Sequence, residues 1–198
     1  MRCQYRMPKT NFHETPDNPI TRRFWGRIDL QFGAAMLYYN KESGVRKLIH
    51  GLKYENKPQI GVLMGELYGR ILRENMYFDQ IDAIVDVPMH PIKEQKRGYN
   101  QATMFAEGLA QTMQKPLIAN AIERYENTES QTKKDKLDRM GVIENLYGVA
   151  HGNDLAGKHI LLVDDVFTTG ATLEGCASAM LALPDTKVSV ATIAIGQR

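Results

Sequence analysis

Two adjacent acids behind a short apolar run are the strongest candidates for a functional site in this chain. Ile160 to Val163 is an unbroken β-branched and aliphatic run, which is typical of a strand buried on both faces of a parallel sheet. Asp164 and Asp165 end this run, and ligands of such sheets bind beyond the carboxyl ends of the strands. An acid pair at that edge suits a ligand with vicinal hydroxyls, or one that arrives with a divalent metal.

A loop rich in hydroxyl groups follows the acids and precedes a predicted helix. The loop consists of Thr168, Thr169, Gly170, Ala171 and Thr172. Its hydroxyls, its glycine and the free N–H groups at a helix N-terminus are donors that can bind a phosphate. Acids for a sugar and donors for its phosphate, a few residues apart, predict a sugar-phosphate ligand. The alternative is a solvated strand end with an ordinary helix cap and turn. A Walker loop is excluded, because no Gly-Lys-Ser/Thr follows at the required spacing.

A second predicted strand, Ile81 to Val87, also leads into a polar loop. This loop contains Pro88, Met89, His90, Pro91, Lys93, Lys96, Arg97, Gly98, Asn100 and Gln101. Cations on a flexible backbone suit an anionic leaving group such as pyrophosphate. We assign that role to Arg97, Asn100 and Gln101, which lie around the glycine. Lys93 and Lys96 are interpreted as part of a solvated charged turn.

Arg46, Lys47, His50 and Lys53 form the basic side of a predicted helix that runs from Val45 to Tyr54. A solvated basic face is the favoured interpretation of this side. The alternative is that Lys53 reaches a bound phosphate, so we include it among the candidate pyrophosphate-binding residues.

The acid pair and its loop resemble the 5-phosphoribosyl diphosphate (PRPP) motif of the type I phosphoribosyltransferases. The resemblance implies that Asp164 and Asp165 hold the ribose hydroxyls, and that residues 168–172 hold the 5-phosphate. The stretches VPMHPIKEQKRGYNQA and LIHGLKY resemble the narrower ComF/GntX branch. By this resemblance the loop at residues 87–91 contacts pyrophosphate, often through a non-proline cis peptide. Members that act on 6-oxopurines usually carry an Asp where this chain has Thr168, which argues against that substrate class.

The order of the predicted elements indicates an α/β fold with a parallel sheet flanked by helices. The predicted strands are Met36–Tyr39, Ile81–Val87, Leu117–Tyr125, Ile160–Val163 and Lys187–Ile195. The predicted helices are Val45–Tyr54, Gln101–Met113 and Ala171–Leu183, together with one that begins after Pro58. The helix after Pro58 has an apolar stripe of Ile60, Leu63, Met64, Leu67 and Ile71. The resemblance implies the type I phosphoribosyltransferase version of this fold, with a small N-terminal hood or arm and a flexible lid loop.

The polar run from Glu126 to Asp138 has no large apolar residue before Leu137 and predicts a mobile loop. Ser130, Gln131 and Thr132 resemble the lid pattern of the family. The resemblance implies that this loop closes over bound PRPP and excludes water. An ordinary surface loop is the alternative.

Length and composition exclude several classes. The chain has 198 residues and a net charge of +2, which is too mild to argue for nucleic-acid binding from charge alone. Its two cysteines, Cys3 and Cys176, supply neither a disulfide framework nor a metal quartet, and Cys176 is expected in the core. No apolar run reaches membrane-spanning length and no signal-peptide pattern is found, so we expect a soluble cytoplasmic protein.

Two segments are expected along the chain. Residues 1–27, with Pro8, Pro16 and Pro19, are expected to form an extended arm that Trp25 anchors to the body. Residues 28–198 are expected to form the phosphoribosyltransferase-like domain. Many members of the branch open with a zinc-binding cysteine module, and residues 1–8 resemble its end. Cys3 and His13 would supply only two of the three or four ligands required, so no zinc is expected and the module is either truncated or lost.

The resemblance implies a protein that binds PRPP with Mg²⁺ and transfers the 5-phosphoribosyl group to an unidentified acceptor, releasing pyrophosphate. Mg²⁺ is expected to bind mainly through PRPP, near Asp164 and Asp165. The alternative is a non-enzymatic adaptor or regulator that responds to PRPP or a nucleotide and is related to competence, the uptake of DNA. A third hypothesis is a partner of single-stranded DNA or of the competence machinery. An oligomer is possible.

Overall fold

The computed structural model describes residues 7–40, 44–125 and 146–196. Its centre is a sheet of four parallel strands in the order β1 (Gly33–Tyr39), β6 (Lys187–Gly196), β5 (His159–Phe167), β2 (Ala83–Asp86). Because every pairing is parallel, the carboxyl ends of all four strands lie along one edge. The predicted α/β parallel sheet is confirmed.

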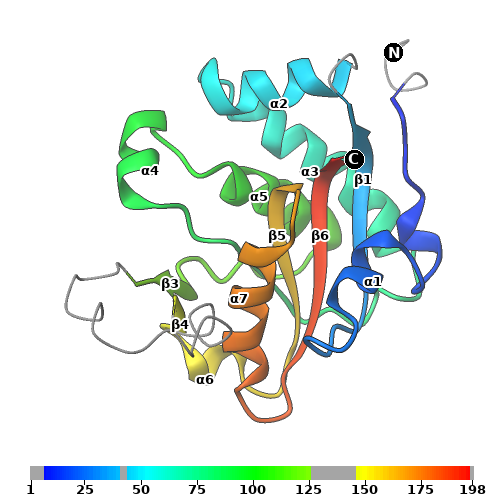
Figure 1. Cartoon of the computed structure of the whole chain (residues 1–198), viewed down its shortest axis with the longest axis vertical. Coiled ribbons are helices and arrows are strands. Elements are labelled where there is room, and N and C mark those ends of the chain that lie inside the picture. Colours follow the sequence, from blue (N-terminus) through cyan, green and yellow to red (C-terminus); the bar gives the residue numbers. More distant parts are fainter. Residues whose placement is uncertain (1–6, 41–43, 126–145, 197–198) are drawn as a thin grey trace, which may run out of the picture.

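Helices cover both faces of the sheet (Figure 1). α2 (Gly44–Tyr54), α3 (Gln59–Arg73) and α5 (Gln101–Met113) pack on one face. α1 (Pro19–Phe24) and α7 (Ala171–Leu181) pack on the other. Alternate residues of β5 therefore enter two separate cores: Ile160 faces the α1–α7 side and Leu161 faces the α3–α5 side. Cys176 is fully buried in α7, as expected.

The remaining elements are short. They are η2 (Phe12–Glu14), α4 (Pro91–Arg97), α6 (Gly152–Leu155), and the antiparallel pair β3 (Ile122–Arg124) and β4 (Tyr147–Val149). One expectation is corrected here, and two short elements were not predicted. The strand expected at Leu117–Tyr125 forms only over Ile122–Arg124, and neither β4 nor α6 was predicted. Three-residue strands and a one-turn helix carry too little periodicity to be recognised in a sequence.

Glycines bring the backbones of α3 and α5 close together. α3 buries Gly61, Gly65 and Gly69, which recur every four residues on one side of the helix. A Cβ at Gly65 would lie 2.3 Å from the carbonyl oxygen of Phe105, so the two backbones are in direct contact. The predicted apolar stripe was therefore partly wrong, since Leu63 is 51% exposed. Counting large apolar side chains places the buried face of α3 incorrectly, because small residues face its partner.

The N-terminal segment is not the irregular extended arm that its prolines suggested. Asn18 caps α1, because its Oδ1 accepts hydrogen bonds from the backbone N–H groups of Ile20 (2.9 Å) and Thr21 (3.3 Å). Its Nδ2 also donates to the carbonyl of Gly33 in β1 at 2.8 Å, which ties the helix to the sheet. Phe24 is 1% exposed, whereas Trp25 is 63% exposed. The apolar anchor of this segment is therefore Phe24, and the expectation for Trp25 was wrong.

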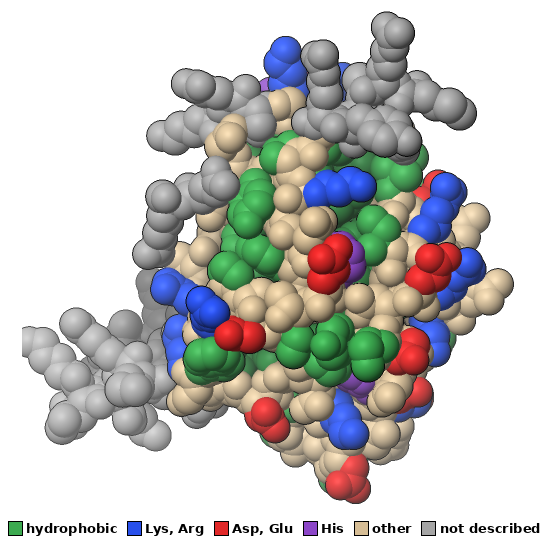
Figure 2. Space-filling view, turned by 90° about the vertical axis from the view of Figure 1, so that its right-hand side faces the viewer, with side chains coloured by type: hydrophobic (Ala, Val, Ile, Leu, Met, Phe, Trp, Pro, Cys, Tyr) green, Lys and Arg blue, Asp and Glu red, His purple; other side chains and the backbone are tan. Residues whose placement is uncertain are grey.

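The surface carries charges of both signs. On the side of the molecule that Figure 2 presents, basic and acidic side chains are interspersed among apolar and neutral ones, in keeping with the net charge of +2. Within the described ranges, no helix combines the length and the hydrophobicity needed to cross a membrane.

Candidate functional site

A pocket of about 810 Å³ opens at the carboxyl ends of the sheet strands and contains most of the predicted site residues. Its size falls within the range that small-molecule sites usually occupy, roughly 300 to 1,000 Å³. The predicted residues that line it are Lys53, Pro88, Met89, His90, Arg97, Asn100, Gln101, Asp164, Asp165, Thr168 and Thr172. Segments that lie more than a hundred residues apart in the chain thus meet at one edge of the sheet.

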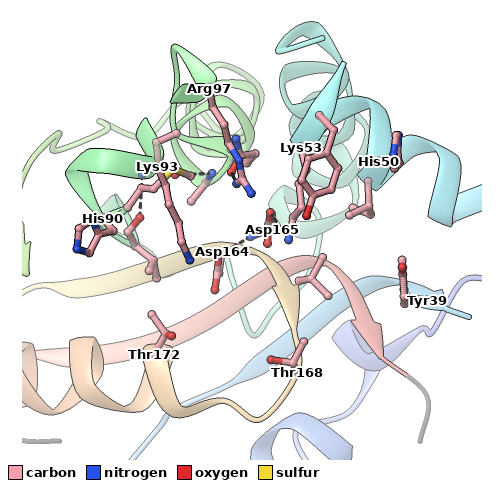
Figure 3. A pocket seen from close by; sticks show the side chains of 18 of the residues that line it. Tyr39, His50, Lys53, His90, Lys93, Arg97, Asp164, Asp165, Thr168 and Thr172 are labelled. Carbon is pink, nitrogen blue, oxygen red and sulfur yellow. Dashed lines mark hydrogen bonds and ion pairs between the residues drawn. The ribbon is translucent and has the colours of Figure 1, made fainter. Parts of the chain in front are cut away.

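The acid pair lies at the centre of this pocket (Figure 3). β5 was expected to end at Val163. It continues to Phe167, so both acids belong to the strand itself. The Nζ of Lys53 lies 2.9 Å from Oδ2 of Asp165, which is only 8% exposed. The backbone N–H of Asp165 donates to Oδ1 of Asp164 at 2.7 Å. The two carboxylates are therefore held by different groups, one by a lysine and the other by the backbone.

The surroundings of Asp164 change its acidity. Burial, and then the negative charge of Asp165, raise the pKa of Asp164 to about 7, although the N–H of Asp165 and the charge of Lys53 both act to lower it. Asp164 therefore titrates near neutral pH. A ligand that donates hydrogen bonds to the pair has to favour its ionised form, so binding at this site is expected to depend on pH.

The loop after β5 is shorter than predicted. It spans residues 168–170, and α7 already begins at Ala171, so Thr172 lies in the first turn of the helix. Gly170 caps α7 with a φ of +83°, a left-handed conformation that glycine adopts without strain. Thr168 and Thr172 line the pocket. Because the first N–H groups of a helix have no intrahelical partner, this turn can bind an anion.

The N-terminal helix supports this loop from the side away from the pocket. Nε of Arg23 donates to the carbonyl of Thr169 at 3.2 Å, and the ring of Phe24 packs edge-on against Phe167 with centroids 5.8 Å apart. A Cβ at Gly170 would lie 3.1 Å from each of these two rings. The contact between α1 and this loop was not predicted. The two segments lie some 145 positions apart, and no feature of either one in the sequence indicates that they meet.

Arg27 connects the same N-terminal region to the first turn of α7. Its guanidinium lies 2.6 Å from Oε2 of Glu174, whose side chain is only 13% exposed. We expect Arg27→Gln to destabilise the protein by about 1 to 2 kcal/mol, because it leaves a mostly buried carboxylate without its partner. Arg22→Gln is the matched control: Arg22 pairs with Asp17 in solvent, and we expect no measurable change. Urea denaturation of both variants tests this, and equal effects would contradict it.

The loop after β2 is braced by Asn100. Its Nδ2 donates to the carbonyl of Val87 at 2.9 Å and to Oδ2 of Asp86 at 3.2 Å, while its Oδ1 accepts from the N–H of Ala102 at 3.0 Å and caps α5. Asn100 is only 8% exposed. Both its amide oxygen and its nitrogen are engaged within the protein, so it acts mainly to hold the loop in place.

The segment from Pro91 to Arg97 forms a helix, α4, where a flexible loop was expected. His90 caps it through Nδ1, which accepts from the N–H of Ile92 at 3.3 Å. Nη1 of Arg97 donates to Oε1 of Gln101 at 2.5 Å, and its guanidinium lies 5.4 Å from the ring centroid of Tyr54. The position of Arg97 is thus set by α5 and α2 together. No peptide bond in the described segments, the 87–91 loop included, is cis.

The described lining of the pocket is positively charged overall. It contains five Lys and Arg residues, namely Arg46, Lys53, Lys93, Arg97 and Arg124, but only two carboxylates, Asp164 and Asp165. Arg46 and Arg124 were not predicted, and Lys93 belongs to the pocket although it was interpreted as part of a solvated turn. The spacing of Arg46, His50 and Lys53 on one side of α2 could have revealed Arg46. Nothing in the sequence around Arg124 indicates a site.

Some predicted residues lie elsewhere. Thr169, Gly170 and Ala171 belong to the loop and the start of α7, but they do not line the pocket. The predicted lid residues Ser130, Gln131 and Thr132 lie outside the described residues. So does Cys3, which leaves His13 as the only described member of the pair that was considered for zinc.

Comparison with known proteins identifies the family. Residues 99–196 match the family model for the phosphoribosyl transferase domain. The chain is 30% identical over 130 residues to competence protein F of Haemophilus influenzae, covering 64% of this chain and 57% of the relative. It is 36% identical over 106 residues to competence protein ComFC of Bacillus subtilis, covering 54% and 41%. The chain belongs to the ComF family of type I phosphoribosyltransferase-like proteins.

The ComF assignment agrees with the fold. Glutamine PRPP amidotransferase from Bacillus subtilis, a structure complexed with ADP and GMP, superposes with a TM-score of 0.50 and 15% identity, covering 72% of this chain and 30% of that one. This likeness shows a common fold. The ComF chain described here spans about half the length of the two curated relatives that it matches.

Proposed function

We propose that this ComF-family chain binds PRPP and transfers its 5-phosphoribosyl group to an acceptor, releasing pyrophosphate. The observation that supports this most is the central position of the acid pair. Asp164 and Asp165 lie between two groups that can bind phosphates. One is the N-terminus of α7 with Thr168 and Thr172, which follows β5, and the other is the loop with cations that follows the neighbouring strand, β2. A sugar with a phosphate at one end and a diphosphate at the other matches this order of groups.

Each part of the ligand has candidate partners. The carboxylates of Asp164 and Asp165 would accept hydrogen bonds from the ribose hydroxyls. Thr168, Thr172 and the free N–H groups of the first turn of α7 would hold the 5-phosphate. Lys93, Arg97 and the backbone of residues 88–90 would hold the diphosphate, with charge-assisted hydrogen bonds from the two cations. Lys53, which pairs with Asp165, can neutralise the acid pair in the absence of ligand and contact a phosphate when ligand is bound.

Mg²⁺ fits this site only together with the ligand. The acid pair offers hard oxygen donors, but the described residues contain no group of three or more His, Cys, Asp or Glu side chains that could hold a metal ion alone. Phosphate oxygens of PRPP would therefore supply most of the ligands, and Asp164 and Asp165 could supply the others. When bound, the ion would neutralise charge on the diphosphate.

The proposed reaction is a displacement at ribose C1. A lone pair of the acceptor forms the new bond to C1 while the bond from C1 to the diphosphate oxygen breaks, and its electron pair leaves with pyrophosphate. Negative charge grows on the leaving group, where Lys93 and Arg97 can stabilise it. Because the acceptor itself attacks C1, catalysis would rest on positioning and electrostatics rather than on a covalent nucleophile of the protein.

Calorimetric titration with PRPP and MgCl₂ tests the binding step, with ribose 5-phosphate as the comparison ligand. We expect saturable binding that is at least about tenfold tighter for PRPP, because only PRPP carries the diphosphate. Arg97→Gln should remove most of this difference. Lys96→Gln is the matched control, since Lys96 is exposed on the same helix and does not line the pocket. Equal affinities for the two ligands would contradict the diphosphate assignment, and no binding of either would contradict the proposal as a whole.

A regulatory role is the second candidate, supported by the names of the relatives, which are competence proteins. In that case PRPP would bind without being consumed. Pyrophosphate release in the presence of acceptors separates the two functions: release assigns a transferase, whereas tight binding without release assigns a sensor.

A further inference from the structure

Lys53 forms an ion pair with one of the two acids that are proposed to hold the ribose. Its Nζ lies 2.9 Å from Oδ2 of Asp165, and the two side chains are only 24% and 11% exposed. In the proposed complex the same carboxylate accepts a hydrogen bond from a ribose hydroxyl. The lysine and the sugar therefore compete for a carboxylate of which little is accessible, and a ligand in the ribose subsite has to draw Lys53 away from it.

The side chain of Lys53 reaches the acid pair from the diphosphate side of the pocket. In Figure 3, Lys53 and Arg97 approach the two carboxylates from the same side, that of the helices, whereas Thr168 and Thr172 lie on the opposite side. All four residues line the same pocket. The ammonium group of Lys53 can therefore turn toward a diphosphate, but it faces away from the subsite proposed for the 5-phosphate.

Contacts between α2 and the segment that carries Arg97 hold Lys53 in this position. The hydroxyl of Tyr99 donates a hydrogen bond to the carbonyl of Leu52, and the guanidinium of Arg97 lies 5.4 Å from the ring centroid of Tyr54. The residues on both sides of Lys53 are thus fixed against the diphosphate side. Its own four-carbon side chain is flexible, so its ammonium group can change partner without a movement of α2.

A diphosphate gives Lys53 a new partner, whereas a 5-phosphate alone does not. Separating two partly buried charges is costly unless each of them gains another partner. The ribose hydroxyls would satisfy Asp165 in either ligand, but the lysine needs an anion within its own reach. PRPP places one there, and ribose 5-phosphate places its single phosphate on the far side of the acid pair.

We propose that Lys53 determines the specificity of the site for PRPP over ribose 5-phosphate, through an ion pair with Asp165 that only a ligand with a diphosphate replaces. This inference rests on the proposed function and adds a coupling between two of its subsites. An anion in the diphosphate subsite should strengthen binding in the ribose subsite, because it draws Lys53 away from Asp165. Repulsion between two anions predicts the opposite sign, so the sign of the coupling identifies the role of the lysine.

Calorimetric titration of ribose 5-phosphate into the wild-type protein, with and without saturating pyrophosphate, measures this coupling. Both titrations are carried out in EDTA, so that no added metal ion can link the two ligands. We expect ribose 5-phosphate to bind at least about fivefold more tightly when pyrophosphate is present. An affinity that stays unchanged or becomes weaker would overturn the proposal.

Lys53→Met is the variant that tests the assigned residue. It should abolish the tightening, so that pyrophosphate leaves the affinity for ribose 5-phosphate within about twofold or reduces it. Lys57→Met is the matched control, because Lys57 pairs with Glu55 on the surface and does not line the pocket, and it should keep the full effect. Tightening that survives in a folded Lys53→Met protein would assign the coupling to another group and overturn the proposal. Should this variant fail to fold, the wild-type titrations decide.

The same titrations separate this inference from the proposed function. If PRPP with Mg²⁺ fails to bind the wild-type protein, the proposed function fails and this inference with it. If PRPP binds but pyrophosphate does not tighten the binding of ribose 5-phosphate, this inference alone is overturned.

Discussion

The double variant Asp164→Asn/Asp165→Asn is expected to lose PRPP binding by at least about 100-fold while the protein stays folded. Each carboxylate lost removes a charged acceptor for the ribose hydroxyls, and hydrogen bonds to charged groups contribute about 1.5 to 3 kcal/mol each. The amide oxygen at position 164 can still accept the N–H of residue 165, which Asp164 accepts at 2.7 Å in the native protein. The local backbone therefore keeps its hydrogen bond, and the loss falls on the ligand.

Stability should change in the opposite direction to binding. The pKa of Asp164 is about 7 in the folded protein, above its ordinary value of 3.8, because burial and the charge of Asp165 disfavour ionisation. Ionised Asp164 therefore costs folding free energy above pH 7, and this cost disappears as the pH falls toward the unfolded value. Asparagine has no such cost. We expect Asp164→Asn to stabilise the protein at pH 8 by on the order of 1 to 4 kcal/mol, and to have little effect near pH 4.

Three measurements check these expectations. Calorimetry with PRPP and Mg²⁺ gives the affinity, thermal denaturation at pH 8 and pH 4 gives the stability, and wild-type titrations at several pH values should show weaker binding below pH 7. Asp185→Asn, an exposed acid far from the pocket, serves as the control and should behave as the wild type. A folded double variant that binds PRPP normally would show that the acid pair does not hold the ribose. A variant destabilised at pH 8 would show that the acids have a structural role.

The sequence predicts which chemical groups form the site, but it does not predict all of the residues that line the pocket. The acid pair, the threonines after it and the residues around Gly98 follow strands directly, and parallel strands bring their carboxyl ends to one edge, so their proximity can be inferred. Tyr39 and Arg46 could not be placed in the same way. They enter the pocket because β1 joins the sheet next to β6, and the partner of a strand depends on packing that no local pattern records.

The fold was predicted where periodicity is strong and was missed where tertiary contacts decide. α2 and α5 have the bounds that their apolar spacing indicates. α1 follows an N-cap, Asn18, and a proline at its first turn, but its three nearby prolines suggested an irregular arm. The buried face of α3 was predicted incorrectly. Its contact with α5 depends on glycines, which contribute no apolar side chain to a pattern. In each case a single short-range rule was outweighed by a contact with a distant element.

The contact between α3 and α5 also connects the core to the site. α5 begins at Gln101, directly after the Asn100 cap that braces the loop after β2. The distance between the two helices therefore determines where Arg97 and Gln101 sit relative to α2, which carries Lys53. Glycines that allow this close approach are thus expected to affect the diphosphate side of the pocket as well as stability.

Gly108→Ala is accordingly expected to destabilise the protein by about 3 kcal/mol or more. A Cβ at this position would lie 2.1 Å from the carbonyl oxygen of Val62 and 2.8 Å from the backbone nitrogen of Glu66, so the helices would have to separate. The gain in helix propensity, about 1 kcal/mol, is too small to compensate. Gly69→Ala should have an intermediate effect, because its nearest contact, at 3.0 Å, is the side chain of Thr112. Gly44→Ala is the matched control, since a Cβ there meets no atom of the described residues within 4 Å.

Urea denaturation of the three glycine variants should therefore order them as Gly44, Gly69 and Gly108, from no loss of stability to the largest loss. PRPP titrations on whichever variants remain folded provide the second readout. We expect Gly69→Ala to weaken PRPP binding while leaving the affinity for ribose 5-phosphate unchanged. That result would mean that the shift of α5 moves the diphosphate side of the pocket and leaves the 5-phosphate side in place. Equal stability of Gly108→Ala and Gly44→Ala would mean that α3 and α5 do not need this close contact, and the proposed link between core packing and the site would be wrong.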